Sequence, residues 1–316
     1  MLKKNLLVWL LLALFILPLS VYPRYTEALI RPVNPEAEEE EVVPGPADEK
    51  LLRILVNGVS IHFDSPPYIK NGRTMVPVRF VSEELGARVD WDGGERKVTV
   101  TKDDKEIVFF IDQTTVWING RERADLLDVP AEISHDRTMV PLRFVGETLE
   151  ARVDWDGEKR LVTVDTAHLI TLYFADEQAA YLVPEQREIW GVNPRNIEDM
   201  SRRVFHELLK GPERPELHRT IHDSGKRNIL VVLTGELPYT GTLILNLTSD
   251  FVDEQKARGM GTAGETMAVY SMVNSLCELP GVERVKFLEE GREVESLFGH
   301  IATDQPVRPR WDLVQR

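Results

Sequence analysis

Two histidines form the first candidate site in the chain. His218 and His222 are four residues apart, the spacing at which two imidazoles on one helix face hold a metal ion. Pro212 and Pro215 come shortly before them, no glutamate lies between them, and the sequence offers no evident third ligand. We therefore expect histidines in a solvent-facing loop and no metal site.

A glycine cluster further along the chain has the form of a nucleotide-binding loop. Residues 259–264 read GMGTAG, which has the spacing of a dinucleotide loop. The polar stretch 252–258 before it lacks the strand rich in Val and Ile that such a loop follows. We interpret the cluster as a flexible lead-in to a helix that begins at Glu265, and we expect no cofactor.

Three nucleophilic side chains lie in that expected helix. Ser271, Ser275 and Cys277 stand among apolar neighbours. A cysteine in such surroundings is usually inert packing, and no base is placed to activate its thiol. The sequence therefore predicts no catalytic residue here, and we find no acid–base pair elsewhere in the chain.

The remaining candidate is a set of aromatic and charged residues that occurs twice. A tryptophan beside a carboxylate and an arginine can stack on a sugar ring and hydrogen-bond its hydroxyls. Alternatively, the tryptophans pack on a helix while neighbouring aspartates shape a turn, and Asp-Gly at a hairpin already accounts for the sequence. We favour the alternative and keep the ligand surface as a hypothesis. Its residues are Arg79, Asp90, Trp91, Arg143, Asp154 and Trp155.

These residues belong to a tandem repeat. Residues 73–93 read RTMVPVRFVSEELGARVDWDG and residues 137–157 read RTMVPLRFVGETLEARVDWDG, with 17 of 21 positions identical at an offset of 64. Upstream, Asn57-Gly58 matches Asn119-Gly120 at an offset of 62, so the second copy has two extra residues before its core motif. Both Asn-Gly pairs predict hairpin turns. A repeat of this kind defines the unit from which the fold is built.

Each copy predicts a short helix packed on small antiparallel sheets. The apolar residues of 78–85 recur at helical spacing, and Gly86 suits the end of a helix. Residues 88–91 and 97–101 alternate as strands around an Asp-Gly-Gly turn. Residues 105–118 are expected to supply two strands that join the copies.

The repeat resembles a known family. The pattern RTMVPxRFVxExLxARVDWDG followed by VTV is similar to the copper amine oxidase N-terminal-like domain, a stalk-type module. The resemblance covers residues 52–166. It implies a secreted or envelope protein of Gram-positive, often endospore-forming, bacteria.

The family name does not carry oxidase chemistry to this chain. An amine oxidase needs a tyrosine-derived quinone and copper held by three histidines. The sequence has no His-x-His pair and no Thr-x-x-Asn-Tyr motif. Its seven histidines are His62, His135, His168, His206, His218, His222 and His300. We therefore reject the oxidase interpretation.

After His168 the pattern changes to an α+β domain with helices on one face of a sheet. One helix is expected to begin after Asn196 as a cap and to end at Lys210-Gly211-Pro212, and a second ends at Pro280-Gly281. The expected helices are 197–209 and 265–279, and the expected strands are 170–174, 181–185, 229–234, 243–247 and 282–287.

This region resembles the GerMN domain of sporulation and spore germination proteins. The segments that carry the resemblance are LYFADEQAAYLVPEQREI (172–189), VFHELLKGP (204–212), LNLTSDF (245–251), AVYSMVNSLCELPGVERVKFLEEGRE (268–293) and GHI (299–301). The resemblance implies an extracytoplasmic, non-enzymatic module, similar to ring-building domains that self-associate in envelope machinery. The best-known member carries two tandem copies, whereas this chain carries one.

The N-terminus predicts export. Lys3 and Lys4 precede the apolar run 6–17, as in a secretory signal. Cleavage and retention as an anchor both remain open, and both place the rest of the chain outside the cytoplasm. The stretch 29–50 has seven acidic residues against Arg31 and Lys50, together with four prolines, and is expected to be an extended spacer.

The predicted organisation has five parts. They are a signal peptide or N-terminal anchor (1–28), an acidic Pro-rich spacer (29–50), a copper amine oxidase N-terminal-like domain with two copies of the motif (51–166), a GerMN domain (167–307) and a tail (308–316), which we expect to be loosely held. The fold class is α+β, with small antiparallel sheets and short helices followed by a sandwich-like GerMN domain.

Composition limits the partners. The 316 residues include 38 Lys and Arg against 52 Asp and Glu, a formal charge of −14, which argues against a nucleic-acid partner. The single cysteine, Cys277, excludes an internal disulfide framework and a Cys-rich metal site.

We expect a non-catalytic envelope protein outside the cytoplasm. Its stalk modules would present a GerMN domain to envelope proteins or to a second copy, and it would reach the membrane through its N-terminal segment if that segment is not cleaved. The alternative is a cell-wall protein that binds peptidoglycan or another carbohydrate.

Overall fold

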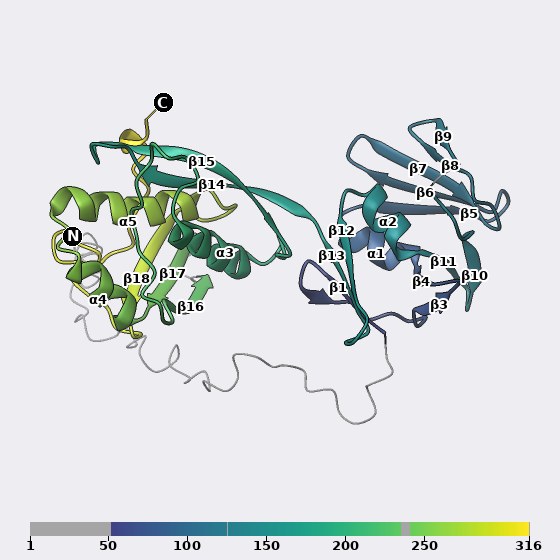
Figure 1. The fold of residues 1–316 in the computed structure, drawn as a ribbon, viewed down its shortest axis with the longest axis horizontal. Helices are drawn as coiled ribbons and strands as arrows, with labels where there is room; N and C mark the ends of the chain where they lie inside the picture. The colour runs from purple at the N-terminus through teal and green to yellow at the C-terminus, as the bar shows by residue number, and fades with distance from the viewer. Residues whose placement is uncertain (1–51, 125, 235–240, 316) are drawn as a thin grey trace, which may run out of the picture. The chain divides into compact units, whose positions relative to one another are not determined.

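A computed structural model describes residues 52–124, 126–234 and 241–315 (Figure 1). The predicted signal or anchor and the acidic spacer lie outside these residues. Of the helices described, none is long and apolar enough to cross a membrane. Short helices and several small sheets share the chain, which confirms the predicted α+β class. We call residues 52–166 the repeat domain and residues 167–315 the C-terminal domain.

Each copy of the repeat contributes the same elements in the same order. Copy one has β1 (Arg53–Val56), β2 (Val59–Ser60), β3 (Tyr68–Lys70), β4 (Arg73–Pro77), α1 (Val78–Glu84), β5 (Arg88–Asp92) and β6 (Lys97–Lys102). Copy two has β8 (Val116–Ile118), β9 (Arg121–Arg123), β10 (Glu132–Ser134), β11 (Arg137–Pro141), α2 (Leu142–Thr148), β12 (Arg152–Asp156) and β13 (Leu161–Asp165). An extra strand, β7 (Lys105–Phe110), lies between the copies in sequence.

The predicted Asn-Gly hairpins are confirmed. Asn57 and Gly58 have φ values of 50° and 77°, and Asn119 and Gly120 have values of 48° and 74°. Positive φ at both central residues is the type I′ geometry, which matches the twist of the flanking strands and which Asn-Gly adopts at low cost. These turns join β1 to β2 and β8 to β9.

The two copies interlock. The hairpin β1–β2 of copy one extends the sheet of copy two, in the order β12-β13-β1-β2. The hairpin β8–β9 of copy two joins the sheet of copy one through β7, in the order β5-β6-β7-β8-β9. A third sheet, β10-β11-β4-β3, takes two strands from each copy. Each sheet therefore needs residues from both copies.

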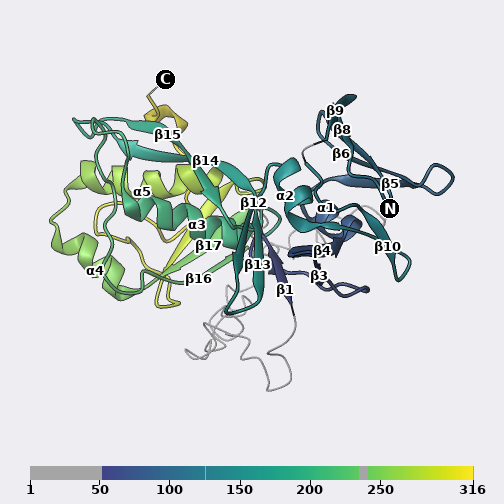
Figure 2. The same ribbon diagram turned by 45° about the vertical axis from the view of Figure 1, so that its right-hand side comes forward.

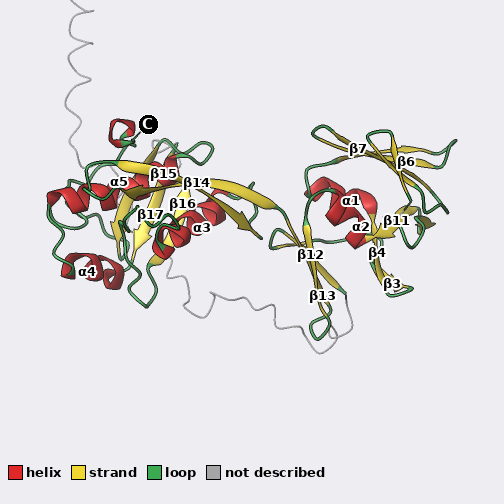
Figure 3. Ribbon diagram, turned by 45° about the horizontal axis from the view of Figure 1, so that its top comes forward, coloured by secondary structure: helices red, strands yellow, loops and turns green. Residues whose placement is uncertain are grey.

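A pseudo-two-fold axis relates the copies. In the third sheet β4 and β11 are antiparallel, and Val76 lies opposite Val140, its own equivalent at the offset of 64. The helices α1 and α2 contact each other (Figure 3). One hydrophobic core contains buried residues of both copies. The repeat thus builds a single domain rather than two modules in series.

Reciprocal ion pairs follow the same symmetry. Arg73 Nη2 of copy one lies 2.6 Å from Asp128 Oδ2 of copy two. Their equivalents face each other in the opposite sense, since Arg137 Nε donates to Asp64 Oδ2 at 3.0 Å. The hydrogen bond from Arg137 holds the pKa of Asp64 below its usual value. Both pairs are open to solvent.

The C-terminal domain contains a long hairpin, a small sheet and three helices among its described residues. Their bounds are β14 (Ala167–Ala175), β15 (Leu182–Trp190), α3 (Ile197–Lys210), β16 (Ile229–Thr234), β17 (Thr242–Leu247), α4 (Ser249–Ala257), α5 (Thr262–Cys277) and β18 (Arg284–Glu289). The hairpin β14–β15 is antiparallel, and the sheet runs β16-β17-β18 with β17 and β18 parallel. Both α3 and α5 contact the hairpin as well as the sheet (Figure 2).

Local signals place the ends of α3. The side chain of Asn196 accepts hydrogen bonds from the N–H groups of Glu198 and Asp199, so the predicted cap is confirmed. The helix ends at Gly211, whose φ of 81° lies in the left-handed region. Its buried face includes Val204, Phe205 and Leu208.

The glycine cluster differs from our expectation. Residues 252–258 belong largely to α4, which the polar sequence did not suggest and which Thr248 caps through Phe251 N–H. Gly259 follows α4 with a φ of 66°, Gly261 caps α5, and Gly264 is already inside α5. The cluster is a tight helix-to-helix connection, because glycine tolerates the backbone conformation that the turn requires.

The tail is also better held than expected. Val307 pairs with Val285 of β18, and the side-chain amide of Asn274 bonds both the N–H and the C=O of Arg310. Gln315 N–H donates to the carbonyl of Leu182. Attachments at Arg310 and Gln315 within the tail, and at Val307 just before it, therefore fix a polar, proline-containing segment that composition alone marked as loose.

Candidate functional site

The repeated tryptophans occupy equivalent places in β5 and β12. Trp91 and Trp155 are 41% and 45% exposed. A Cβ on Gly93 would lie 3.4 Å from Trp91 Nε1, and a Cβ on Gly157 would lie 3.3 Å from Trp155 Nε1. Each indole edge therefore lies close to the glycine of its turn, while part of the ring remains open to solvent.

The aspartates after the tryptophans shape the turns. Asp92 Oδ1 accepts from the N–H groups of Gly94 and Glu95, and Asp156 Oδ1 accepts from Glu158 and Lys159. These backbone hydrogen bonds, with Glu95 and Lys159 foremost, hold the pKa of both carboxyls below the usual value. Both side chains thus act as the turn-forming groups that the Asp-Gly pattern predicts.

The aspartates before the tryptophans face the other way. Successive side chains of a strand alternate between its faces, so Asp90 and Trp91 point to opposite sides of β5, as do Asp154 and Trp155 of β12. Asp90 shares its face with Arg88, whose guanidinium binds it through two hydrogen bonds of 2.9 Å. The structure does not bring carboxylate and indole together within a copy.

The helix arginines are exposed. Arg143 Nη1 lies 3.3 Å from Glu147 Oε1, one turn along α2. For Arg79 of α1 no hydrogen bond or ring contact to Asp90 or Trp91 occurs in the described part of the chain. Ligand binding by the six predicted residues stays a hypothesis, and the two half-exposed indoles are its strongest part.

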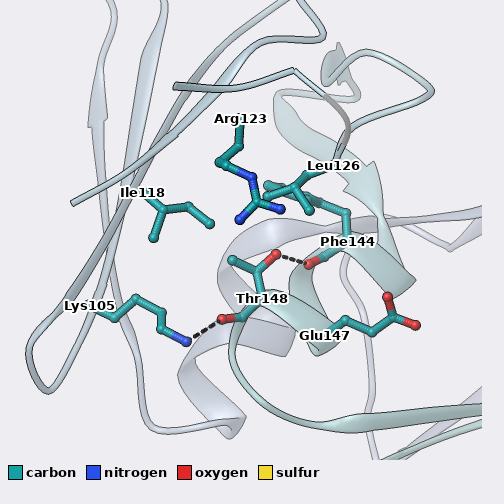
Figure 4. Close-up of a pocket in the computed structure, with 7 residues that line it drawn as sticks. All are labelled: Lys105, Ile118, Arg123, Leu126, Phe144, Glu147 and Thr148. Atoms are coloured by element: carbon teal, nitrogen blue, oxygen red, sulfur yellow. Dashed lines mark hydrogen bonds between the residues drawn. The ribbon is translucent and has the colours of Figure 1, made fainter. Parts of the chain in front are cut away.

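A cavity beside α2 is a site that we did not predict (Figure 4). Its volume is about 220 Å³. Lys105 Nζ donates to the carbonyl of Thr148 at 3.1 Å, and the Thr148 hydroxyl donates to the carbonyl of Phe144 at 2.6 Å. The lining residues are Lys105, Ile118, Arg123, Leu126, Phe144, Glu147 and Thr148. A sequence signal existed, because Arg123 replaces Ile61 of copy one at the third position after Asn-Gly.

The paired histidines His218 and His222 of the C-terminal domain differ in their exposure to solvent. His218 is exposed and forms a backbone bridge to Ala175. His222 is half-buried, and burial together with Arg258 and Arg219 lowers its pKa. Within the residues that the structure describes, no three His, Cys, Asp or Glu side chains gather to hold a metal.

The nucleophiles of α5 hold the fold. Ser275 Oγ accepts from Tyr173 N–H, and Ser271 Oγ donates to the carbonyl of Tyr173. These two bonds attach α5 to the edge of β14, where a neighbouring strand would otherwise bind. Burial, with a smaller effect of Glu278, raises the pKa of the Cys277 thiol to about 12, so the thiol is protonated at neutral pH.

A charge network lies inside the C-terminal domain. Arg187 is 7% exposed and binds the carboxylates of Glu185 at 2.5 Å and Glu207 at 3.3 Å, as well as the carbonyl of Gly211. Glu185 also accepts from the N–H groups of Glu213 and Arg214. The network joins β15 to the end of α3 and to the loop that follows.

A second buried carboxylate anchors another loop. Glu265 is fully buried at the start of α5 and accepts from the N–H groups of His300 and Ile301 and from the Ser296 hydroxyl. Glu265, like the charge network and the α5 serines, is bonded to backbone groups. These buried acidic, basic and hydroxyl side chains therefore position loops and strands through their hydrogen bonds.

Two family models match separate regions of the chain. Residues 55–164 match the model of the copper amine oxidase N-terminal domain, and residues 171–295 match the model described as sporulation and spore germination. Both resemblances are therefore confirmed. The matched amine oxidase region is the N-terminal domain and not the catalytic one. No curated protein matches the chain.

Three solved structures are similar to part of the chain. A protein from Clostridium perfringens described as a lipoprotein is 20% identical over 45% of this chain and 87% of its own, with a TM-score of 0.31. The tandem GerMN domains of the sporulation protein GerM from Bacillus subtilis are 15% identical over 45% of this chain and 46% of that chain, with a TM-score of 0.34. The first GerMN domain of that protein is 15% identical over 46% and 98%, also with a TM-score of 0.34.

Proposed function

We propose that this chain, in which a region matching the copper amine oxidase N-terminal domain precedes one matching a sporulation and spore germination domain, is a non-catalytic envelope protein. Its repeat domain would carry the C-terminal domain as a stalk, and the C-terminal domain would contact an envelope protein or a second copy. The match of residues 171–295 is the observation that carries the proposal.

The use of polar groups in the C-terminal domain supports an interaction module. Glu185, Glu265 and Ser271 are buried and hold backbone atoms. A partner protein would then be bound by side chains on the surface of the domain. Among these, Leu169 is 65% exposed and Tyr181 is 48% exposed. Exposed apolar and aromatic side chains are the residue types that protein interfaces use.

A photocrosslinking experiment in cells tests this proposal. A photoreactive amino acid at Leu169 or Tyr181 should capture an envelope protein or a second copy of the chain. The matched controls are Ile69 and Ile133 of the repeat domain, which are similarly exposed and should capture neither. Capture from the controls alone, or fractionation that finds the native protein free in the cytoplasm, would overturn the proposal.

A second candidate function is binding of cell-wall carbohydrate. The observation that favours it is the partial exposure of both Trp91 and Trp155 at equivalent places in the repeat. Sedimentation with purified cell wall should weaken in the double variant Trp91→Ala, Trp155→Ala. Trp311→Ala removes a similarly exposed indole from the C-terminal domain and should leave binding unchanged. Equal binding by the double variant and the native protein rejects this surface.

A further inference from the structure

One strand of the repeat domain has no counterpart in the other copy. The four-stranded sheet runs β12-β13-β1-β2, and the equivalents of these strands in the five-stranded sheet are β5, β6, β8 and β9. In the four-stranded sheet β13 pairs directly with β1. In the five-stranded sheet β7 lies between β6 and β8 and pairs with both. The side chains that β7 presents are therefore an addition to the repeated plan.

Strand β7 is apolar on both of its faces. Ile107 and Phe109 are buried in the hydrophobic core that the two copies share. Val108 and Phe110 alternate with them, so they lie on the opposite face of the sheet, where they are partly exposed. An antiparallel sheet that packs one face on a core usually carries polar residues on the other. We call this second face the outer face, and its apolar residues on β7 are not needed to fill the core.

A tryptophan of the next strand enlarges this apolar surface. Trp117 of β8 lies directly opposite Val108, and it is partly exposed. Its ring meets that of Phe110 edge-on, with 5.6 Å between centroids and 88° between the planes. The equivalent of Trp117 in copy one is Leu55. We call Val108, Phe110 and Trp117 the outer patch, and aromatic residues of this kind are enriched where proteins bind one another.

Two carboxylates stand beside the tryptophan. Glu122 of β9 lies directly opposite Trp117 and therefore shares its face. Glu106 precedes Val108 by two residues on β7, so it also lies on the outer face. Both side chains belong to exposed residues, and no ion pair joins either carboxylate to a cation in the part of the chain that the structure describes. The outer patch is thus bordered by negative charge that a partner can reach.

The cations of the outer face are already engaged by other acids. The guanidinium of Arg88 binds Asp90 through two hydrogen bonds of 2.9 Å, and Lys97 Nζ lies 2.5 Å from Glu95 Oε2. Arg121 and Arg123 of β9 alternate with Glu122 and so lie on the opposite face. The charged side chains of the outer face on these strands are Arg88 and Lys97 against Asp90, Asp92, Glu106 and Glu122. The outer face is therefore acidic, and complementary charge calls for a basic partner.

We propose that the outer patch binds a short arginine-containing segment of a partner protein. A guanidinium can stack on the indole of Trp117 while it pairs with Glu106 or Glu122, and an apolar residue beside it contacts Val108 and Phe110. A second copy of this chain is a poor occupant, because it would bring the same acidic face and a formal charge of −14.

This inference goes beyond the function proposed for the chain, in which the repeat domain only carries the C-terminal domain. The outer patch lies on a different sheet from the crosslinking controls Ile69 and Ile133, which belong to β3 and β10. Failure of one proposal therefore leaves the other standing.

Calorimetric titration of the full-length chain tests the patch. The probe is the peptide acetyl-Arg-Thr-Leu-Thr-Arg-amide, in which threonine favours an extended backbone and the first, third and fifth side chains share a face. The reference is the same peptide with both arginines replaced by citrulline, which has a similar shape and no charge. The arginine peptide should bind at least about tenfold more tightly, since citrulline removes the cation–π contact and the ion pairs. Equal binding of the two peptides would overturn the proposal.

Variants locate the binding on the outer face. Trp117→Leu and Glu122→Ser install the copy-one residues Leu55 and Ser60, so neither brings a residue type foreign to this hairpin. Each should weaken binding of the arginine peptide about threefold or more, and the double variant about tenfold. Glu106→Gln keeps the shape of the side chain and should act in the same direction. Hydrogen exchange of β8 peptides verifies that the hairpin remains folded.

The matched control is the double variant Trp155→Leu, Glu158→Ser. It makes the same two chemical changes at exposed residues of copy two and should leave binding of the arginine peptide unchanged. An equal loss in this control, or undiminished binding in Trp117→Leu, Glu122→Ser and in Glu106→Gln, refutes the outer patch as the site. A neutral N-acetylglucosamine tetramer whose binding depends on Trp117 would assign the patch to carbohydrate and would also overturn the proposal.

Discussion

The two domains place arginine–carboxylate pairs in opposite environments. Arg73–Asp128 and Arg137–Asp64 link the copies of the repeat domain, and their side chains are about half exposed. In the C-terminal domain Arg187 and its partners Glu185 and Glu207 are all less than a tenth exposed. The same residue types therefore have different roles, because solvent screens the first set and is excluded from the second.

The difference shows how each domain is held together. The copies of the repeat domain share three sheets and a hydrophobic core, and these contacts hold the copies together. The exposed ion pairs between the copies therefore add little to the stability of the domain. The hairpin β14–β15 has no third strand among the described residues, and buried polar groups attach it to α3 and α5. The C-terminal domain should thus be far more sensitive to loss of a single charge.

The largest effect is expected from the buried arginine. Arg187→Met leaves Glu185 buried without its cation and removes one of the cations that bind Glu207, so it should lower the free energy of unfolding of the C-terminal domain by about 3–5 kcal/mol. Hydrogen exchange of α3 peptides under increasing urea measures this change. Arg137→Met is the exposed counterpart, and a cost of similar size there would break the comparison.

A single methyl group in the repeat domain should have the next largest effect. A Cβ on Gly146 would lie 2.4 Å from Val153 Cγ2, a stiff β-branched side chain, so Gly146→Ala should destabilise the domain by about 1–3 kcal/mol. Its equivalent in copy one is Ser82, which is fully buried and whose hydroxyl finds no hydrogen-bond partner among the residues that the structure describes. Ser82→Ala should therefore be neutral or stabilising. Urea unfolding followed by hydrogen exchange of α1 and α2 compares the two variants. Equal losses in the free energy of unfolding would contradict the different roles assigned to Gly146 and Ser82.

The pH dependence of stability should also differ between the domains. Burial opposes ionisation of Glu207, but hydrogen bonds from Lys210 and Arg187 hold its pKa below the ordinary value in the folded state. Its contribution is therefore complete above the unfolded-state pKa of about 4.3 and is lost as pH falls through the folded-state pKa. Unfolding of the C-terminal domain measured from pH 7 down to about pH 3 should show the loss, and Glu207→Gln should reduce it. Asp64→Asn is the exposed control, and a larger effect of that variant on acid sensitivity would argue against the buried network.

The smallest effect concerns the exposed pairs themselves. A double-mutant cycle with Arg137→Met and Asp64→Asn should give a coupling energy below about 1 kcal/mol. The coupling should fall further at high salt, because solvent-exposed charges are screened. A coupling energy above about 2 kcal/mol that salt does not change would show that these ion pairs themselves stabilise the repeat domain.

Local sequence signals found most of the elements. Asn-Gly turns, the Asn196 cap and the apolar periodicity of 197–209 act over a few residues, so they are legible without the fold. Helix α4 was missed because its sequence is polar and its few buried residues, such as Phe251 and Val252, pack against distant parts of the chain. The tail was misjudged for the same reason, since Asn274 and Leu182 hold it from other elements.

The candidate sites, like the helices and the tail, were predictable only where they depend on neighbouring residues. The sequence alone determined that the motif occurs twice, that the turns contain Asp and Gly, and that two known domain families follow one another. The sequence could not show that Asp90 and Trp91 lie on opposite faces of β5. Nor could it show that Arg123 lines a cavity beside Phe144. Repeats, turns and caps depend on neighbouring residues, whereas cavities, buried charge networks and the interlocking of the two copies depend on contacts between residues far apart in the chain. Only the tertiary structure decides those contacts, because they are made once the whole chain has packed.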